Sequence, residues 1–247
     1  MAKRRDLDTL LRDWNYRPDD IVARVLKGSD GRPILQMRVD LGILQMETKD
    51  RPDGQRPHGE RTYYDYLIRE SLDEENQDFT MTAEQCSLAD QEFSQFYHRR
   101  VCWLSLREYR RAVEDADHTL SFMDFVRDHS PNEDWTISHE QYRPFVLFHR
   151  VQAAVLAELE ENGPESAIAE LNRGLNRFKQ LYVDYEAEDK YSEDEFVQRL
   201  NDLKTSLKTH FKIGRSAEDL LAEAIEKEDY ETAAKLRDEL ARNKRKN

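Results

Sequence analysis

Glycine and proline are concentrated at one end of this chain, and their distribution constrains how the rest can fold. Five of the eight glycines and four of the seven prolines lie within the first 60 of 247 residues. Beyond residue 62 few helix-breaking residues remain, charged residues are frequent, and apolar residues recur with helical spacing. The sequence therefore predicts a mainly α-helical protein with a different structure at its N-terminus.

The N-terminal segment contains three strand candidates. Residues 21–26 are apolar and β-branched, and residues 28–31 supply turn chemistry before a second candidate at 34–39. A third follows at once, so we expect a small antiparallel meander over residues 20–48. Three strands rarely hold together alone in water, and this sheet should therefore pack against a helix.

A repeated tripeptide predicts the register of the second and third strands. Leu-Gln-Met occurs at 35–37 and again at 44–46, separated by a turn at Asp40-Leu41. Folding back there gives the meander one apolar and one polar face. The predicted pairs are Leu35 with Met46, Gln36 with Gln45, and Met37 with Leu44.

Two helix pairs are predicted in the central region, at 88–126 and 144–183. Aromatic and small residues alternate along the first pair, whose helices are joined by a short link at 106–108. This pattern resembles the tetratricopeptide repeat, in which small residues at helix crossings let neighbouring helices pack closely. The corresponding alanines, Ala112 and Ala167, are 55 residues apart. A regular array would space them by about 34 residues, so residues 128–142 are interpreted as an insertion.

One further amphipathic helix is predicted within 184–215, with a capping box that runs from Ser192 to Glu195. Beyond it, Ser216–Asp219 starts a short helix and Asp229 caps a second one. The last 32 residues are therefore predicted to form a helical hairpin. The whole chain divides into a meander with its loop at 1–62, a tetratricopeptide-like helical-hairpin body at 63–213, and the hairpin at 214–247.

The sequence of residues 224–240 resembles the UVR motif. This motif is shared by the excision-repair proteins UvrB and UvrC and by activators of bacterial protein arginine kinase. Its aromatic-Glu-x-x-Ala-x-x-Arg-Asp core is present, with tyrosine where phenylalanine is commoner. In that family the hairpin is a protein-protein contact module, so the resemblance implies a bacterial protein that binds another UVR-bearing protein or a second copy of itself. The partner-binding residues it implies are Leu221, Ile225, Tyr230, Glu231, Ala234, Arg237 and Asp238.

The physical character of the hairpin agrees with this interpretation. Chains below about 40 residues usually need a disulfide, a metal or a partner to be stable. We therefore expect the apolar face of the hairpin to pack against another surface. We expect Arg237 to pair with Glu231 or with a carboxylate of the partner. The alternative is that this face docks on the chain's own helical body.

The acidity of the chain is confined to its middle. Residues 1–62 carry 13 basic and 11 acidic groups, residues 63–215 carry 18 and 31, and residues 216–247 carry 7 and 9. The net charge of -13 argues against direct binding to nucleic acid or to an anionic membrane, and favours a basic peptide as a partner of the helical body. Basic clusters at 3–5 and 242–246 are interpreted as solubilising tails.

Signatures of catalysis and of metal or cofactor binding are missing from the sequence. No two of the seven histidines have the spacing of a zinc helix, and acidic runs such as Glu114–Asp117 are typical of a solvated helix face. Nucleotide-binding and hydrolase motifs are also missing. We therefore predict no enzyme, no cofactor and no metal. The place for a small-ligand site, if one exists, is the loop at 49–59, where Asp53 and His58 lie among arginines.

These observations predict a cytoplasmic, non-enzymatic adaptor. With only two cysteines and no apolar stretch of 18 residues, the sequence favours a reducing cytoplasm and no membrane span. Two alternatives stay open: an accessory factor of nucleotide excision repair that contacts Uvr proteins and DNA, and an enzyme with a site in the 49–59 loop.

Overall fold

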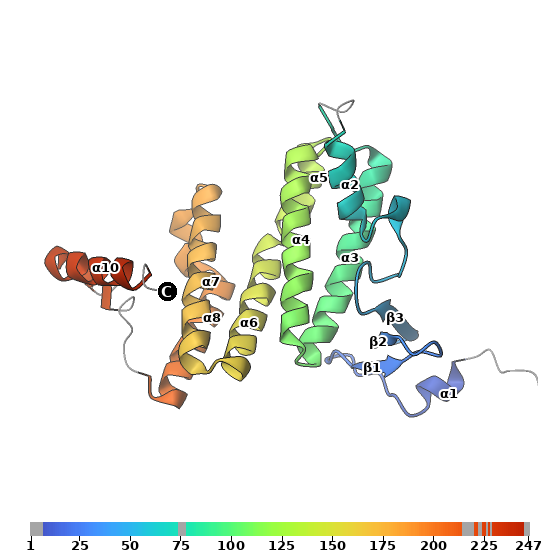
Figure 1. The fold of residues 1–247 in the computed structure, drawn as a ribbon, viewed down its shortest axis with the longest axis horizontal. Helices are drawn as coiled ribbons and strands as arrows, with labels where there is room; N and C mark the ends of the chain where they lie inside the picture. Colours follow the sequence, from blue (N-terminus) through green and yellow to red (C-terminus); the bar gives the residue numbers. More distant parts are fainter. Residues whose placement is uncertain are drawn as a thin grey trace, which may run out of the picture. The chain divides into compact units, whose positions relative to one another are not determined.

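A computed structural model describes residues 7–73, 78–213, 220–221, 224–225, 227 and 229–244. The chain divides into two compact units, Met1–Leu200 and Asn201–Asn247. The described residues form a mainly helical protein with one small sheet near the N-terminus, so the predicted fold class is confirmed (Figure 1). None of the described helices has both the length and the apolar character needed to cross a membrane.

The first unit begins with a short helix and a three-stranded antiparallel meander. Helix α1 covers Asp8–Leu11, and the strands are β1 (Ala23–Lys27), β2 (Pro33–Val39) and β3 (Gly42–Glu47). The strands lie in the order β1-β2-β3. Across β2 and β3 the three predicted pairs are all observed, so the repeated tripeptide gave the correct register.

One face of the sheet is buried against helices and the other is covered by the N-terminal segment. Leu35 packs with Trp103 in a shared hydrophobic cluster, as predicted. On the opposite face, which is predicted to be polar, Gln36 is only 6% exposed. Arg24 donates to Oε1 of Gln36, and its guanidinium lies 3.9 Å from the ring centroid of Trp14. A cation-π contact between Arg24 and Trp14 therefore covers part of the face that was predicted to be polar.

Helices make up the rest of the first unit. Their bounds are α2 (Tyr63–Ser71), α3 (Ala83–Ser105), α4 (Tyr109–His129), α5 (Glu133–Glu140), α6 (Arg143–Glu161) and α7 (Pro164–Asp184), with 3-10 turns η1 (Pro57–Gly59) and η2 (Glu188–Glu193). Helices α3 and α4 pack side by side, α4 packs on α6, and α6 packs on α7 (Figure 1). The two predicted helix pairs are confirmed, and their likeness to tetratricopeptide repeats stays a prediction.

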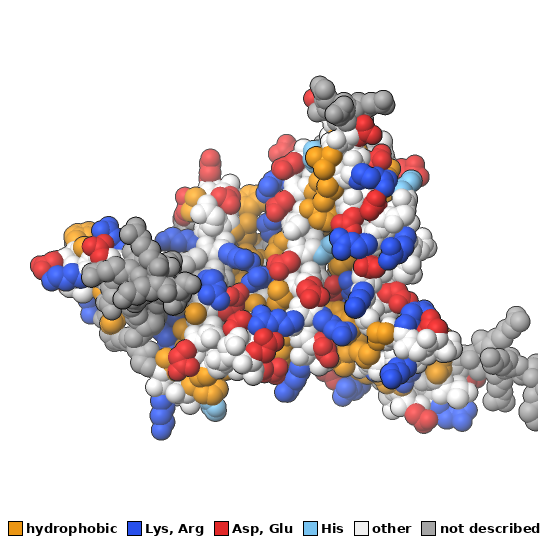
Figure 2. Space-filling view, in the orientation of Figure 1, with side chains coloured by type: hydrophobic (Ala, Val, Ile, Leu, Met, Phe, Trp, Pro, Cys, Tyr) orange, Lys and Arg blue, Asp and Glu red, His pale blue; other side chains and the backbone are white. Residues whose placement is uncertain are grey.

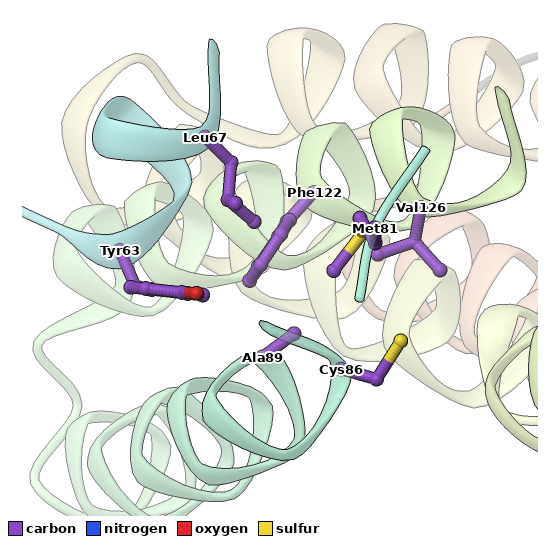
Figure 3. Close-up of a cluster of buried hydrophobic side chains, with 7 residues drawn as sticks. All are labelled: Tyr63, Leu67, Met81, Cys86, Ala89, Phe122 and Val126. Carbon is purple, nitrogen blue, oxygen red and sulfur yellow. The ribbon is translucent and has the colours of Figure 1, made fainter. Parts of the chain in front are cut away.

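A hydrophobic cluster joins α2 to the first helix pair. Figure 3 shows its side chains converging from α2, from the segment just before α3, from the first two turns of α3 and from the second half of α4. The members of the cluster are Tyr63, Leu67, Met81, Cys86, Ala89, Phe122 and Val126. Because each helix contributes an apolar stripe to one common core, α2 is fixed on the helix pair by burial of that surface.

Helix α8 covers Glu195–Phe211, and its N-terminal cap lies two residues after the predicted cap, Ser192. The Oδ1 atom of Asp194 accepts a hydrogen bond from the amide of Val197 at 2.8 Å, so Asp194 caps this helix and Ser192 does not. Ser192 instead belongs to the 3-10 turn η2. The Oδ2 atom of Asp194 also accepts from the hydroxyl of Tyr182 at 2.6 Å, which ties the start of α8 to α7.

Candidate functional site

The described part of the second unit centres on helix α10 (Tyr230–Lys244), where the sequence predicts partner binding. Residues 220–221 and 224–225 are helical as well. Asp229 caps α10 as predicted: its Oδ1 accepts from the amide of Thr232 at 3.1 Å and its carbonyl from the amide of Ala233 at 3.0 Å. Hydrogen bonding from Thr232 holds the pKa of the Asp229 carboxyl below its ordinary value. The amide of Asp229 in turn donates to the carbonyl of Ala224 at 2.8 Å, which links the cap to the preceding helical residues.

Around the start of α10, two alanines are buried and two large side chains are exposed. Ala224 and Ala233 are both buried, whereas Ile225 and Tyr230 are open to solvent, and the side chain of Tyr230 is 69% exposed. Leu221 is half-buried. Alanines permit close approach of backbone segments, and the exposed isoleucine and tyrosine are left available for other contacts.

The predicted partner-binding residues of α10 fall on two adjacent stripes of the helix. Tyr230, Ala234 and Arg237 follow the i, i+4, i+7 spacing that places side chains on one face, and Glu231 and Asp238 lie beside them. All five are exposed to solvent. The structure therefore brings them together as one continuous surface, which we call the α10 stripe.

The charged groups of the α10 stripe pair locally. Glu231 pairs with Lys235 one turn later, with Nζ 2.7 Å from Oε1, and Arg237 lies 3.1 Å from the carboxylate of its neighbour Asp238. Of the two predicted partners of Arg237, Glu231 is paired with Lys235 instead, and a carboxylate of the binding partner stays a prediction. Exposed ion pairs of this kind hold little energy, so both arginine and glutamate are free to exchange partners.

The loop at 49–59 is ordered by contacts with α2 and α3. Arg51 is buried, and its Nη2 donates to Oε1 of Gln91 on α3 at 3.0 Å. His58 instead stacks on the ring of Tyr66 on α2, with centroids 4.0 Å apart. Asp53 accepts from Nε2 of Gln95 at 3.0 Å. Arg51 and Asp53 thus lie together, with Nε of Arg51 3.3 Å from Oδ2 of Asp53 and both side chains bonded to Gln95. His58 is engaged separately, on α2.

Sequence reasoning missed a buried carboxylate that holds this region together. Glu92 on α3 is fully buried, and it accepts from the first amides of α2, those of Tyr63 at 2.7 Å and Tyr64 at 3.1 Å. Arg51 and His118 approach the same carboxylate, at 3.6 and 3.1 Å. A helix start carries unpaired amide donors and positive partial charge, so Glu92 serves as a remote cap for α2.

Another expectation about acidic residues is wrong in part. Asp115 was expected on a solvated face, but it is buried and paired with Arg99 of α3. Elsewhere on the helical body basic and acidic side chains are interspersed, as Figure 2 shows. Arg110, for example, bridges Glu158 and Glu161 between α4 and α6. Many acidic side chains of the middle segment are thereby paired within the protein, while the segment keeps its excess of 31 acidic over 18 basic groups.

Among the described residues, no group of three or more histidine, cysteine, aspartate or glutamate side chains has the geometry to hold a metal ion. Both cysteines are buried, and burial raises the pKa of the Cys102 thiol to about 12, which keeps it unreactive. The basic cluster at 3–5 lies outside the described residues, and so does the end of the cluster at 242–246 beyond Lys244.

A cleft of about 800 Å³ between α3, α4, α5 and α6 was not predicted. It is lined by aromatic side chains from α3, from both ends of α5 and from the start of α6. From the sequence, residues 128–142 are interpreted only as an insertion, and this cleft is therefore not predicted. The cleft forms because α5, within that segment, folds back over α3.

Comparison with known families agrees with the C-terminal assignment. The described fold is that of a mainly helical protein, and the α10 stripe is an exposed surface of its second unit. The family described as "UvrB/uvrC motif" (UVR) matches residues 215–246, which include the whole of the stripe. Neither the curated proteins nor the solved structures yield a match to this chain.

Proposed function

We propose that this protein is a non-enzymatic adaptor whose C-terminal UVR motif binds another UVR-bearing protein or a second copy of the chain. The observation that carries the proposal is the exposure of Tyr230 at 69% within the matched motif, on one stripe with Ala234 and Arg237. Tyrosine and arginine are enriched among residues that dominate binding energy. An alanine between them lets a partner approach the helix closely.

The size of the motif supports the same proposal. A pair of short helices buries too little surface to be stable alone, and its natural completion is a second pair of the same kind. Local pairing of Arg237 with Asp238 and of Glu231 with Lys235 leaves these charges exposed for exchange with a partner. Such rim charges set orientation and the rate of association more than affinity.

The helical body would then hold a second partner, which makes the chain an adaptor rather than a simple dimer. Successive packed helix pairs, α3 with α4 and α6 with α7, present extended surfaces of the type that grips peptides in helical-repeat proteins. Residues 63–215 carry 18 basic against 31 acidic groups, so a basic peptide is the complementary partner.

The proposal is tested by measuring the affinity of the full chain for purified UvrB, for purified UvrC and for itself. Tyr230→Ala should weaken the binding that is found by at least about tenfold, as expected for a central aromatic anchor. Leu72→Ala removes an equally exposed apolar side chain at the end of α2 and should leave affinity unchanged. Equal affinities of both variants and the parent would contradict the proposal.

A DNA-binding measurement on the same purified protein distinguishes the excision-repair alternative from the adaptor proposal. A factor that also contacts DNA would bind duplex DNA with an affinity that falls steeply with salt. Neutralising the basic residues at 3–5 and 242–246 would then abolish DNA binding. The adaptor proposal expects neither effect.

A further inference from the structure

The cleft between α3, α4, α5 and α6 has the size and wall chemistry of a small-molecule site. Its volume of about 800 Å³ falls within the range of roughly 300–1,000 Å³ that such sites occupy. All of the residues that line the cleft belong to the first unit. We call it the aromatic cleft after its principal lining residues: Phe93, Tyr97, Trp135, Tyr142 and Phe145.

Side chains of the walls are fixed by mutual contacts. Phe93 stacks on Phe122 at 4.7 Å between centroids, and its other neighbour is the His139 ring at 4.9 Å. Trp135 lies 4.6 Å from the same histidine. At the rim, Nε2 of His139 lies 2.8 Å from Oδ1 of Asp90. The walls are therefore preorganised, which reduces the entropic cost of binding a ligand.

A buried arginine lines the cleft without a carboxylate partner. Arg100 is 1% exposed, and its Nη1 donates to the neutral hydroxyl of Thr119 at 3.1 Å. In the described part of the chain its Nε has no hydrogen-bond partner. The nearby carboxylate of Asp115 is already held at two points by Arg99. Arg100 thus brings a positive charge to the cleft that no carboxylate among the described residues pairs.

The surroundings of Arg100 favour its neutralisation by a ligand. Burial lowers the pKa of its guanidinium to about 10, so the group still carries its charge at neutral pH. His149 supplies no negative charge, and burial together with Arg100 lowers its pKa to about 4. A buried and unpaired charge is costly, and a bound anion would recover much of that cost.

The rim and the buried arginine differ in charge. Asp90 and Arg100 lie ten residues apart on α3, which places them about 15 Å apart along the helix. A ligand with its anionic group near Arg100 therefore keeps clear of the carboxylate at the rim. The space between is lined by aromatic rings and suits an apolar body.

We propose that the aromatic cleft binds a small molecule that has an apolar body and a single carboxylate, with the carboxylate paired to the guanidinium of Arg100. Planar carboxylates match the fork of arginine donors and form the strongest class of hydrogen-bonded ion pair. The apolar body packs between the rings of Tyr97, Trp135 and Phe145.

Calorimetric titration of the full chain with 2-naphthylacetate tests this proposal, with 2-(2-naphthyl)ethanol and 2-(2-naphthyl)ethylammonium as neutral and cationic analogues. The carboxylate should bind at least about tenfold more tightly than the alcohol, and the ammonium analogue should bind more weakly than either. Equal affinities for acid and alcohol, or no binding of the acid at about 1 mM, would overturn the proposal.

Three variants locate the site. Arg100→Met should reduce affinity for the acid to that of the alcohol while leaving alcohol binding intact, which also shows that the variant is folded. Ser94→Trp fills the cleft from an exposed position on α3 and should abolish binding of both compounds. Arg177→Met removes a charge from the exposed face of α7 and should change nothing. Unchanged affinity for the acid in both Arg100→Met and Ser94→Trp would place binding elsewhere and refute the assignment.

Discussion

Arg99 of α3 holds Asp115 of α4 in a two-point ion pair, with Nη2 2.7 Å from Oδ1 and Nε 3.0 Å from Oδ2. Both side chains are only 5% exposed. The remaining nitrogen of Arg99, Nη1, donates to the backbone carbonyls of Glu47 and Asp50 at 3.2 and 2.8 Å. One side chain therefore connects the end of the sheet and the following loop to both helices of the first pair.

Removing the carboxylate of this pair should destabilise the protein strongly. Asp115→Ala leaves the Arg99 guanidinium buried without compensation, and we expect a loss of about 3–5 kcal/mol in the free energy of unfolding. Urea denaturation provides the measurement. Asp128→Ala, which removes an exposed carboxylate at the end of α4, should cost less than about 1 kcal/mol. Similar losses of unfolding free energy in the two variants would show that the buried ion pair stabilises the protein no more than an exposed one.

The protein should lose stability on mild acidification through His149. Its pKa is lowered to about 4 in the folded state, first by burial and then by the charge of Arg100. The unfolded chain, with an ordinary histidine pKa of about 6.5, binds the proton more readily between these values. The contribution of His149 to the free energy of unfolding is therefore fully present above about pH 6.5, and up to about 3 kcal/mol of it is lost as the pH drops toward 4.

The contribution of His149 is isolated by comparison with His149→Leu. Carboxylates elsewhere change stability in the same pH range in both proteins, so the difference between the two unfolding free energies reports this histidine. That difference should shift in favour of the variant as the pH falls from about 7 to 4.5. A difference that stays constant with pH would contradict the assignment.

The contact between α6 and α7 requires a glycine. A Cβ atom built at Gly174 would collide with both methyl groups of Val151 and lie 3.1 Å from its Cβ. Gly174→Ala should therefore destabilise the protein by about 1–3 kcal/mol, although alanine has the higher helix propensity. In a Val151→Ala background the same change should cost less, with a coupling of at least about 0.5 kcal/mol in a double-mutant cycle. Additive costs would show that the two helices adjust independently.

The start of α10 should depend on the carboxylate of Asp229. Asp229→Ala removes the acceptor for the Thr232 amide, so that amide should exchange with solvent faster, whereas Asp229→Ser retains a capping oxygen and should preserve its protection. Hydrogen bonding depresses the pKa of Asp229, so the stabilisation is present at neutral pH and is lost as the pH falls below about 4. Equal exchange rates in the alanine and serine variants would contradict this role.

Local sequence patterns predicted those features that depend on local spacing. The repeated Leu-Gln-Met tripeptide predicted the pairing of β2 with β3, because alternation along a strand and one turn position determine the register. The link at 106–108 and the Asp229 cap were likewise predicted from residues within a few positions of each other. The prediction of Ser192 as the cap was wrong because both Ser192 and Asp194 are capping residue types ahead of α8. Ser192 lies in the 3-10 turn η2, and Asp194 caps the helix.

Features that join distant segments were missed. Asp115 has the sequence context of a solvated residue, and only the packing of α3 on α4 brings Arg99 to it. Glu92 caps a helix that begins 29 residues earlier in the chain. The aromatic cleft depends on where α5 lies relative to α3, a placement that no periodicity within either helix specifies. Each of these features depends on contacts between helices, and sequence periodicity predicts each helix separately without its neighbours.

The most direct test of the adaptor proposal is photo-crosslinking from position 230. The full chain with p-benzoylphenylalanine in place of Tyr230 is expressed in its source cell, and the crosslinked peptides are identified by mass spectrometry. We expect crosslinks to a UVR-bearing protein or to the UVR motif of a second copy, and none to the same partner when the probe replaces Tyr16 on the first unit. Crosslinks from position 230 to residues 7–213 of the same chain would contradict the proposal, because the α10 stripe would then dock on its own helical body.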